Sequence, residues 1–270
     1  AVPQSALSVA MRLIPFVALL LIATPVQAQL RDFCASRPGL GTPPCTVDPG
    51  HVVVEVGLAD WTLENSTDER TDTIIGGDIA VRIGLDDKTE ALVGWTSFGH
   101  TRVRDKATGA VTRSSGIGDI TLGIRRSLSG PDGPIAIQPY ITIPVGGAAI
   151  GAGDWGAGIV VPIGFDLGRD VQLSLSPQVE ATVNASRSGR HLSYGSVIGL
   201  SAPLAKGLSG AIEFQAVRDE EPSGKTTQLL ASASLAWLIG SETQLDIGGV
   251  AGLNRDSPNV QLYFGISRRF

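Results

Sequence analysis

The sequence predicts an all-β fold, namely a membrane-spanning, up-and-down antiparallel β-barrel of about twelve strands over residues 51–270. Three observations lead to this prediction. Apolar and polar side chains alternate along most of the chain after Gly50, and a period of two residues is the period of a strand. Short and long links between the alternating segments take turns. Charged residues also stand in the middle of the polar faces.

The N-terminal region predicts export. Residues 11–28, MRLIPFVALLLIATPVQA, combine Arg12, an apolar stretch and a small-x-small ending at Ala28, which is the pattern of a secretory signal peptide. The apolar stretch is short for a membrane-spanning helix, although an uncleaved anchor is the alternative. We assign residues 1–28 to the signal peptide and expect residues 1–10 of this range to precede the natural start at Met11. The mature chain is expected to begin near Gln29.

Residues 29–50 are expected to form an N-terminal periplasmic segment. This segment holds both cysteines of the chain, Cys34 and Cys45, with a Gly- and Pro-rich stretch between them. Because export delivers the chain to an oxidising compartment, we expect a disulfide between the two. The alternative is lipid attachment to a cysteine, which needs small residues directly before it, and Asp32 and Phe33 do not meet this need.

The expected strands follow one another from residue 51 onward. The clearest is 171–184, where every odd position is apolar and every even position is polar. The same alternation recurs in 78–85, 119–125, 135–143, 244–247 and 259–270. Turn residues predict tight turns near 86–88, 130–133, 167–170, 205–207 and 240–242. Longer links are expected near 64–72, 99–116, 146–153, 184–190, 218–225 and 254–258.

Strand length and charge favour a membrane barrel over a soluble sandwich. The segments are roughly 10–14 residues long, whereas strands of globular sheets most often have about 5–6. About 9–11 tilted residues cross the apolar core of a bilayer. Every backbone group must be paired there, so the sheet must close into a ring. We therefore expect the last alternating segment, 259–270, to pair with the first strand, with Phe270 at the membrane boundary.

The polar faces supply the candidate functional residues. Seven charged side chains are expected to line the lumen: Glu55, Arg82, Asp119, Arg125, Glu180, Glu213 and Asp246. A barrel of about twelve strands has a narrow interior. Two interpretations stay open, because these charges could pair and close the lumen or could line a selective path.

Three stretches carry a resemblance to a known family. They are GIGDITLGIRRSL at 116–128, followed by IQPYITIPVG at 137–146, together with the ending at 244–270. The chain resembles the transporter-like outer-membrane β-barrel family linked to the meta-pathway of phenol degradation. The resemblance implies a place in the outer membrane of a Gram-negative-type cell. It also implies insertion by the barrel-assembly machinery and passage of small apolar or aromatic solutes, and it names no site residues.

Other function classes receive little support from the sequence. The net charge is −5 and no basic face is found, which argues against nucleic-acid binding. The GxGxxG match at 151–156 is followed by a strand-like segment, whereas a dinucleotide site needs a helix there. We expect no cofactor. His51 and His100 have no partners at metal-ligand spacing, so no metal site is expected.

A hydrolase is the remaining alternative. His191 and Ser193 share one face of a strand, and Glu180 or Glu213 could supply the acid partner that orients the histidine. Polar residues are nevertheless expected on a lumen face. We therefore expect a passive channel rather than an enzyme. A structural barrel with a plugged lumen and functional surface loops is the closest rival.

Overall fold

The computed structural model describes residues 30–147 and 149–270, so the expected signal peptide lies outside the described residues. Residues 31–270 form one compact unit. The described ranges are built of strands and links, without helices. Accordingly, they include no helix that is long and apolar enough to cross a membrane.

Fourteen strands make up the unit. They are β1 (Val52–Asn65), β2 (Glu69–Asp86), β3 (Thr89–Asp105), β4 (Val111–Gly116), β5 (Ile120–Ser127), β6 (Ala136–Ile143), β7 (Gly156–Val160), β8 (Ile163–Asp166), β9 (Gln172–Val183), β10 (Arg190–Ala205), β11 (Leu208–Asp219), β12 (Thr226–Ile239), β13 (Thr243–Gly252) and β14 (Val260–Arg269).

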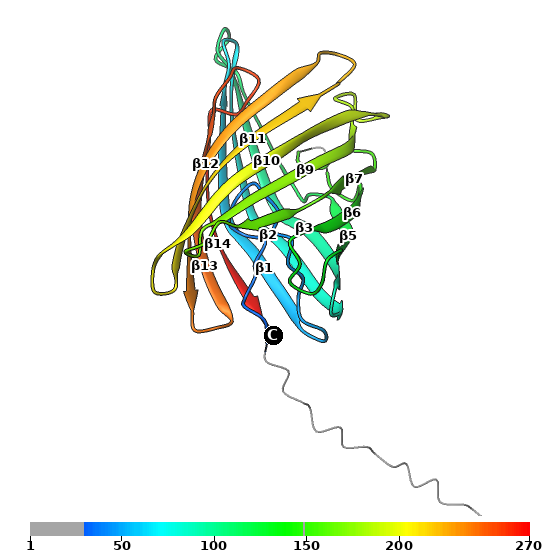
Figure 1. Cartoon of the computed structure of the whole chain (residues 1–270). Coiled ribbons are helices and arrows are strands. Elements are labelled where there is room, and N and C mark those ends of the chain that lie inside the picture. The colour runs from blue at the N-terminus through cyan, green and yellow to red at the C-terminus, as the bar shows by residue number, and fades with distance from the viewer. Residues whose placement is uncertain (1–29, 148) are drawn as a thin grey trace, which may run out of the picture. The chain divides into compact units, whose positions relative to one another are not determined.

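These strands close into an antiparallel ring (Figure 1). The last strand, β14, pairs with β1, and β9 pairs with β10. β4 and β5 both pair with β3, and β7 and β8 both pair with β9. β4 and β5 therefore share one position in the barrel wall, and β7 and β8 share another. The fourteen strands thus fill twelve positions around the ring. The expected barrel of about twelve strands is confirmed, as is the pairing of the last strand with the first.

The strands extend further than predicted at one end of the barrel. The expected links 64–72 and 99–116 prove to be mostly strand, because β2 and β3 stay paired as far as Glu69 and Asp105. Asp72 there lies 2.9 Å from Arg70 and 3.5 Å from Arg102. In this extension charged residues that form ion pairs stand where an apolar face would be. The alternation of apolar and polar residues is therefore lost, and the segment was predicted to be a loop.

The two faces of the wall differ as the alternation predicts. On β14 the outward side chains Leu262 and Phe264 are 52% and 47% exposed, whereas the inward Tyr263 is 8% exposed. Arg268 is on the outward parity, with its guanidinium 5.2 Å from the ring centre of Phe270. An apolar outside and a polar inside are the arrangement of a transmembrane barrel.

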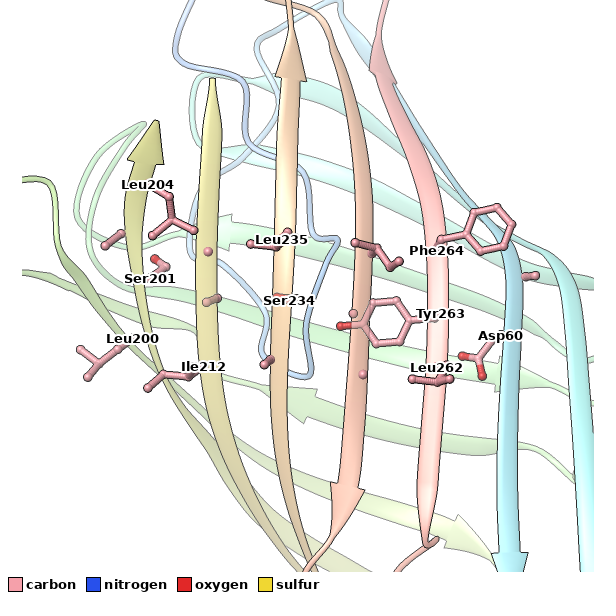
Figure 2. Close-up of a pocket in the computed structure, with 18 of the residues that line it drawn as sticks. Asp60, Leu200, Ser201, Leu204, Ile212, Ser234, Leu235, Leu262, Tyr263 and Phe264 are labelled. Atoms are coloured by element: carbon pink, nitrogen blue, oxygen red, sulfur yellow. The ribbon is translucent and has the colours of Figure 1, made fainter. Parts of the chain in front are cut away.

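Small residues among large ones hollow the outer face (Figure 2). The hollow has a volume of about 1040 Å³ and runs along β10–β14 and the neighbouring β1 and β2. Most of its lining is outward-facing, such as Leu200, Ile212, Leu235 and Leu262. Because this face is apolar and faces lipid in a membrane barrel, the hollow is a feature of the lipid-facing surface and not of the lumen.

Candidate functional site

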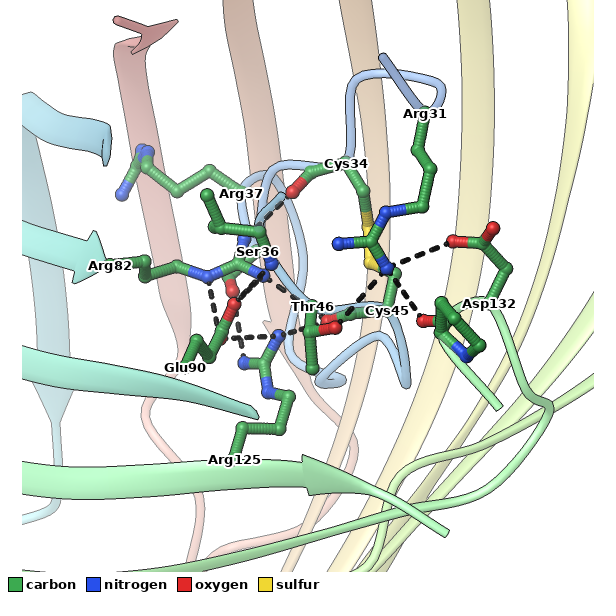
Figure 3. Close-up of a disulfide and its surroundings, with 12 residues drawn as sticks. Arg31, Cys34, Ser36, Arg37, Cys45, Thr46, Arg82, Glu90, Arg125 and Asp132 are labelled. Atoms are coloured by element: carbon green, nitrogen blue, oxygen red, sulfur yellow. Dashed lines mark hydrogen bonds and ion pairs between the residues drawn. A yellow bond between two sulfur atoms is a disulfide. The ribbon is translucent and has the colours of Figure 1, made fainter. Parts of the chain in front are cut away.

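Residues 31–50, called the plug below, lie inside the barrel (Figure 1). The sequence predicted a periplasmic segment here and gave no reason to place it in the lumen. Cys34 and Cys45 of the plug are joined by a disulfide (Figure 3). The disulfide closes the middle of the plug into a loop, and the barrel wall holds this loop from several strands.

The centre of the lumen carries a quartet of buried charges, made up of Glu55, Arg82, Glu90 and Arg125. Each of the four is at most 1% exposed. Arg82 donates to Glu90 at 2.9 and 3.0 Å and to Glu55 at 3.2 Å, and Arg125 lies 3.3 Å from Glu90. Two cations and two carboxylates balance, which is the condition under which charges can be buried.

The arginines of the quartet hold the plug by its carbonyl oxygens (Figure 3). Arg82 donates to the carbonyl of Cys34 at 2.7 Å and to that of Cys45 at 3.2 Å. Arg125 donates to the same Cys45 carbonyl at 3.0 Å. Both ends of the disulfide loop are therefore bonded to buried cations.

The carboxylates of the quartet hold the plug by its amides. Glu55 accepts from the backbone of Ser36 and Arg37, both at 2.9 Å. Glu90 accepts from the Val47 amide at 2.7 Å. The quartet thus satisfies plug backbone groups that would otherwise be buried without partners, a loss that costs about 1–3 kcal/mol for each group.

Glu213 on β11 holds the tip of the plug. Its carboxylate accepts from the amides of Leu40 and Gly41 at 2.7 and 2.9 Å, and from the hydroxyl of Ser232 at 2.8 Å. Gly39 has a φ of +118°, and a Cβ there would lie 2.8 Å from the Glu213 oxygens. Glycine is required at this position, because it permits both the backbone conformation and the close approach.

Arg37 pins the plug to the seam where the barrel closes. Its guanidinium lies 3.0 Å from Asp246 and 5.5 Å from the ring centre of Tyr263. Gly57 and Gly265 face each other across the β1–β14 pair. A Cβ on Gly265 would lie 2.6 Å from Nε of Arg37. The two glycines therefore leave the space that the arginine occupies.

A second group of charges lies at the tight-turn end of the barrel. Arg269 on β14 lies 3.1 Å from Asp48 of the plug and 2.6 Å from Glu242 of the neighbouring turn. Arg31 lies 2.8 Å from the same Asp48. This group joins the end of the plug to the last strand of the wall.

Six of the seven charges expected in the lumen are on wall strands, and five of them contact the plug or belong to the quartet. The five are Glu55, Arg82, Arg125, Glu213 and Asp246. The sixth, Glu180 on β9, is in register with Gly158 of β7, which in turn is in register with Tyr140 of β6. A Cβ on Gly158 would lie 2.6 Å from the Tyr140 hydroxyl, so the tyrosine ring crosses this glycine towards Glu180.

Asp119 is placed differently from the expectation. It lies between β4 and β5 and accepts from the amides of Gly146 and Ala152, both at 2.7 Å. The strand is broken at residues 117–119, so the parity assumed for Asp119 does not continue from β5. Its carboxylate joins Gly146 to Ala152 and is not part of the plug site.

Six charged residues of the site were missed from the sequence: Arg31, Arg37, Asp48, Glu90, Glu242 and Arg269. Glu90 shares its parity with Leu92 and Gly94, so the inward face of this segment reads as apolar. Arg37 and Asp48 are in a segment without any period. The one signal in the sequence was that the charges predicted on the other strands must have partners of opposite charge if they are buried.

His191 and Ser193 do not form the pair that a hydrolase needs. The ring nitrogens of His191 lie 2.6 Å from Asp219 and 3.1 Å from Glu221. The His191 side chain is 5% exposed. Ser193 is buried and in register with Glu180, and no hydrogen bond joins it to His191 among the described residues. The histidine instead connects β10 with the end of β11 and the link that follows.

A closed antiparallel barrel of twelve strand positions, with an apolar outer face and a polar interior, places the fold among outer-membrane β-barrel proteins. The chain belongs to the family described as "Putative MetA-pathway of phenol degradation", whose model matches residues 35–270. The fold and the family expected from the sequence are thereby confirmed. A search of curated protein sequences found no match to this chain.

Solved structures share this fold. An outer membrane channel from Pseudomonas putida F1 is similar at a TM-score of 0.69 and 15% identity, over 87% of this chain and 100% of that one. The β domain of the Bordetella autotransporter BrkA is similar at 0.52 and 14% identity, over 83% and 100%. The translocator domain of the autotransporter NalP from Neisseria meningitidis is similar at 0.50 and 15% identity, over 82% and 88%.

Proposed function

We propose that this protein is a passive channel for small hydrophobic or aromatic molecules in the outer membrane of a Gram-negative-type cell. The observation that carries the proposal is a closed barrel whose lumen holds a bonded plug and, beside the plug, a cavity of about 340 Å³. Its family is described by a pathway of phenol degradation. The similar protein from Pseudomonas putida F1 is named as an outer membrane channel.

Export and orientation complete the proposal. Residues 1–28 direct export as a signal peptide, and the barrel-assembly machinery inserts the mature chain. The tight turns face the periplasm and the long links face outward, as in other outer-membrane barrels. The plug is joined to the tight-turn end through Asp48 and Arg269, so it enters the lumen from the periplasmic side.

Passage through such a channel needs no covalent chemistry. Selection comes from the width of the path and the polarity of its lining. The quartet is internally neutral and its hydrogen-bonding capacity is used on the plug. A hydrated ion gains little there and would have to lose its water. A small neutral molecule pays a much smaller desolvation cost than an ion, so it can move past the plug.

A structural barrel with a closed lumen is the second candidate. The number of bonds between plug and wall favours it, because Glu55, Arg82, Glu90, Arg125 and Glu213 all hold the plug backbone. We further propose that the chain catalyses no reaction. The contacts of His191 with Asp219 and Glu221 support this, since they engage both ring nitrogens of the histidine with carboxylates.

Uptake into cells separates the two candidates. Initial entry of radiolabelled phenol at low concentration is measured in a Gram-negative host with and without the protein, in both cases with a phenol-consuming enzyme in the cytoplasm. The channel predicts faster uptake when the protein is present in the outer membrane. Equal uptake in both strains, with the folded barrel present, would favour the closed structural barrel.

A further inference from the structure

We propose that the cavity between the plug and the β8–β11 wall binds one small, neutral, hydroxylated aromatic molecule and disfavours aromatic anions. The inference rests on the proposed channel function and names the molecules that the channel selects. The cavity has a volume of about 340 Å³. Apolar cavities of about 150 Å³ hold benzene, so this one has room for a single substituted ring.

Small side chains create the space. On this side of the lumen the inward-facing wall residues lining the cavity include Ser174, Gly199, Ser201 and Ala211. They face one another across neighbouring strands, because Gly199 is in register with Ser174, and Ser201 with Ala211. The opposite wall carries the large charged side chains of the quartet. The plug is therefore packed tightly on one side and leaves an open space on the other.

The plug is held in a position that keeps the cavity open. Its disulfide loop is bonded to the quartet on the far side. At the tip, Glu213 accepts from the Gly41 amide at 2.9 Å, and Thr42 donates its amide to Ser176 at 3.0 Å. With both sides attached, the plug cannot settle onto the small-residue wall.

The lining suits a ring that bears a hydroxyl group. Pro38, Pro43 and Pro44 of the plug supply apolar surface, and the lining also includes the hydroxyl residues Ser36, Thr42, Ser174 and Ser201. Pockets of this kind, mostly apolar with a few polar groups, are typical small-molecule sites. A phenolic hydroxyl can donate to a serine oxygen or to the Glu213 carboxylate, while the ring packs on the prolines.

The charge of the lining works against anions. Among the lining residues that the structure describes, Glu213 is the one ionisable group. Arg82 donates to plug carbonyls, Glu55 and Glu90. Arg125 donates to the Cys45 carbonyl, to Gln138 and to the Ser36 hydroxyl. Neither arginine is among the residues that line this space. An aromatic carboxylate would lose its water without gaining a cation and would face a like charge. A neutral phenol avoids both costs.

Binding is measured directly on the folded, detergent-solubilised barrel by fluorine NMR. The probes are 4-fluorophenol, which is neutral at pH 7, and 4-fluorobenzoate, which is an anion. We expect saturable binding of 4-fluorophenol and at least tenfold weaker binding of 4-fluorobenzoate. Ala211→Leu fills the cavity and should weaken 4-fluorophenol binding at least tenfold. Ala233→Leu, the same change on the exposed outer face of the neighbouring strand, should leave binding unchanged.

A second variant guards against misfolding. Ser201→Leu fills the same space from β10, and heat-modifiable migration on gels shows which variants are folded. Wild-type binding that persists in a folded Ala211→Leu or Ser201→Leu barrel would overturn the inference, as would equal binding of the two probes. Because binding is measured without transport, its loss leaves the proposed channel function standing. Binding without uptake in cells would instead refute the channel function alone.

Discussion

Arg82→Met tests whether the buried quartet keeps the plug in the lumen. The guanidinium of Arg82 is fully buried and makes bonds to Glu55, Glu90 and the carbonyls of Cys34 and Cys45. Methionine keeps an unbranched chain but removes every donor. The change leaves two buried carboxylates with one cation, Arg125, and two plug carbonyls with fewer donors.

The size of the effect of Arg82→Met on plug docking follows from the burial of the ion pairs that it breaks. Removing one partner of a buried ion pair typically costs about 3–5 kcal/mol. A factor of ten in an equilibrium constant corresponds to about 1.4 kcal/mol. The ratio of docked to released plug should therefore fall by roughly 100-fold to several thousand-fold. Part of this cost falls on the wall itself, so the lower end of the range applies to the plug.

The assay is ion conductance in planar bilayers. The wild-type barrel should show small, rare openings because the plug fills the lumen, and Arg82→Met should show frequent, larger openings. Arg113→Met is the control, since Arg113 is exposed on β4 and in register with Arg102, twelve residues along β3 from Glu90 of the quartet. If folded Arg82→Met barrels conduct like the wild type, the quartet does not hold the plug and the reasoning is wrong.

Three further predictions concern the seam, the disulfide and the outer links. Gly265→Ala places a Cβ 2.6 Å from Nε of Arg37, so it should displace that side chain, raise conductance and lower the temperature at which the barrel unfolds on gels. Cys34→Ser opens the plug loop, which should destabilise plug docking by about 2–4 kcal/mol and make the plug more sensitive to protease; unchanged cleavage would contradict this. The hydrogen bond from the Ala185 amide lowers the pKa of Glu221 from 4.5. The stabilising contribution of Glu221 is therefore present above pH 4.5 and is lost as the pH falls through the lowered value. A nitroxide on the link 220–225 should gain mobility only in that acid range, and constant mobility down to pH 2 would argue against this contact.

The sequence alone was sufficient to assign the two faces of the barrel wall across the membrane. Alternation along β9 and β14 identified which side chains face out, because a period of two follows directly from strand geometry. The same rule failed at 64–72 and 99–116, where ion pairs such as Arg70 with Asp72 replace the apolar face. In these two segments the strands continue beyond the apolar band that faces lipid, so no apolar face is needed there.

The interior of the site could not be predicted in the same way. Arg37 and Asp246 are 209 residues apart in the chain, and their contact depends on the register of the strands and on the path of the plug. The plug has no period, and its bonds run from backbone groups that every residue carries. Sequence reasoning found five of the wall charges that hold the plug. It missed the charges of the plug itself, and only the structure shows that the plug is the common partner of the wall charges.

The most direct test of the account is phenol uptake by cells that carry matched amounts of folded wild-type, Ala211→Leu or Ala233→Leu barrel. The account predicts that wild type and Ala233→Leu raise the initial uptake rate above that of cells without the protein, whereas Ala211→Leu does so far less. Uptake that is equal for all three barrels would contradict the claim that solutes pass beside the plug.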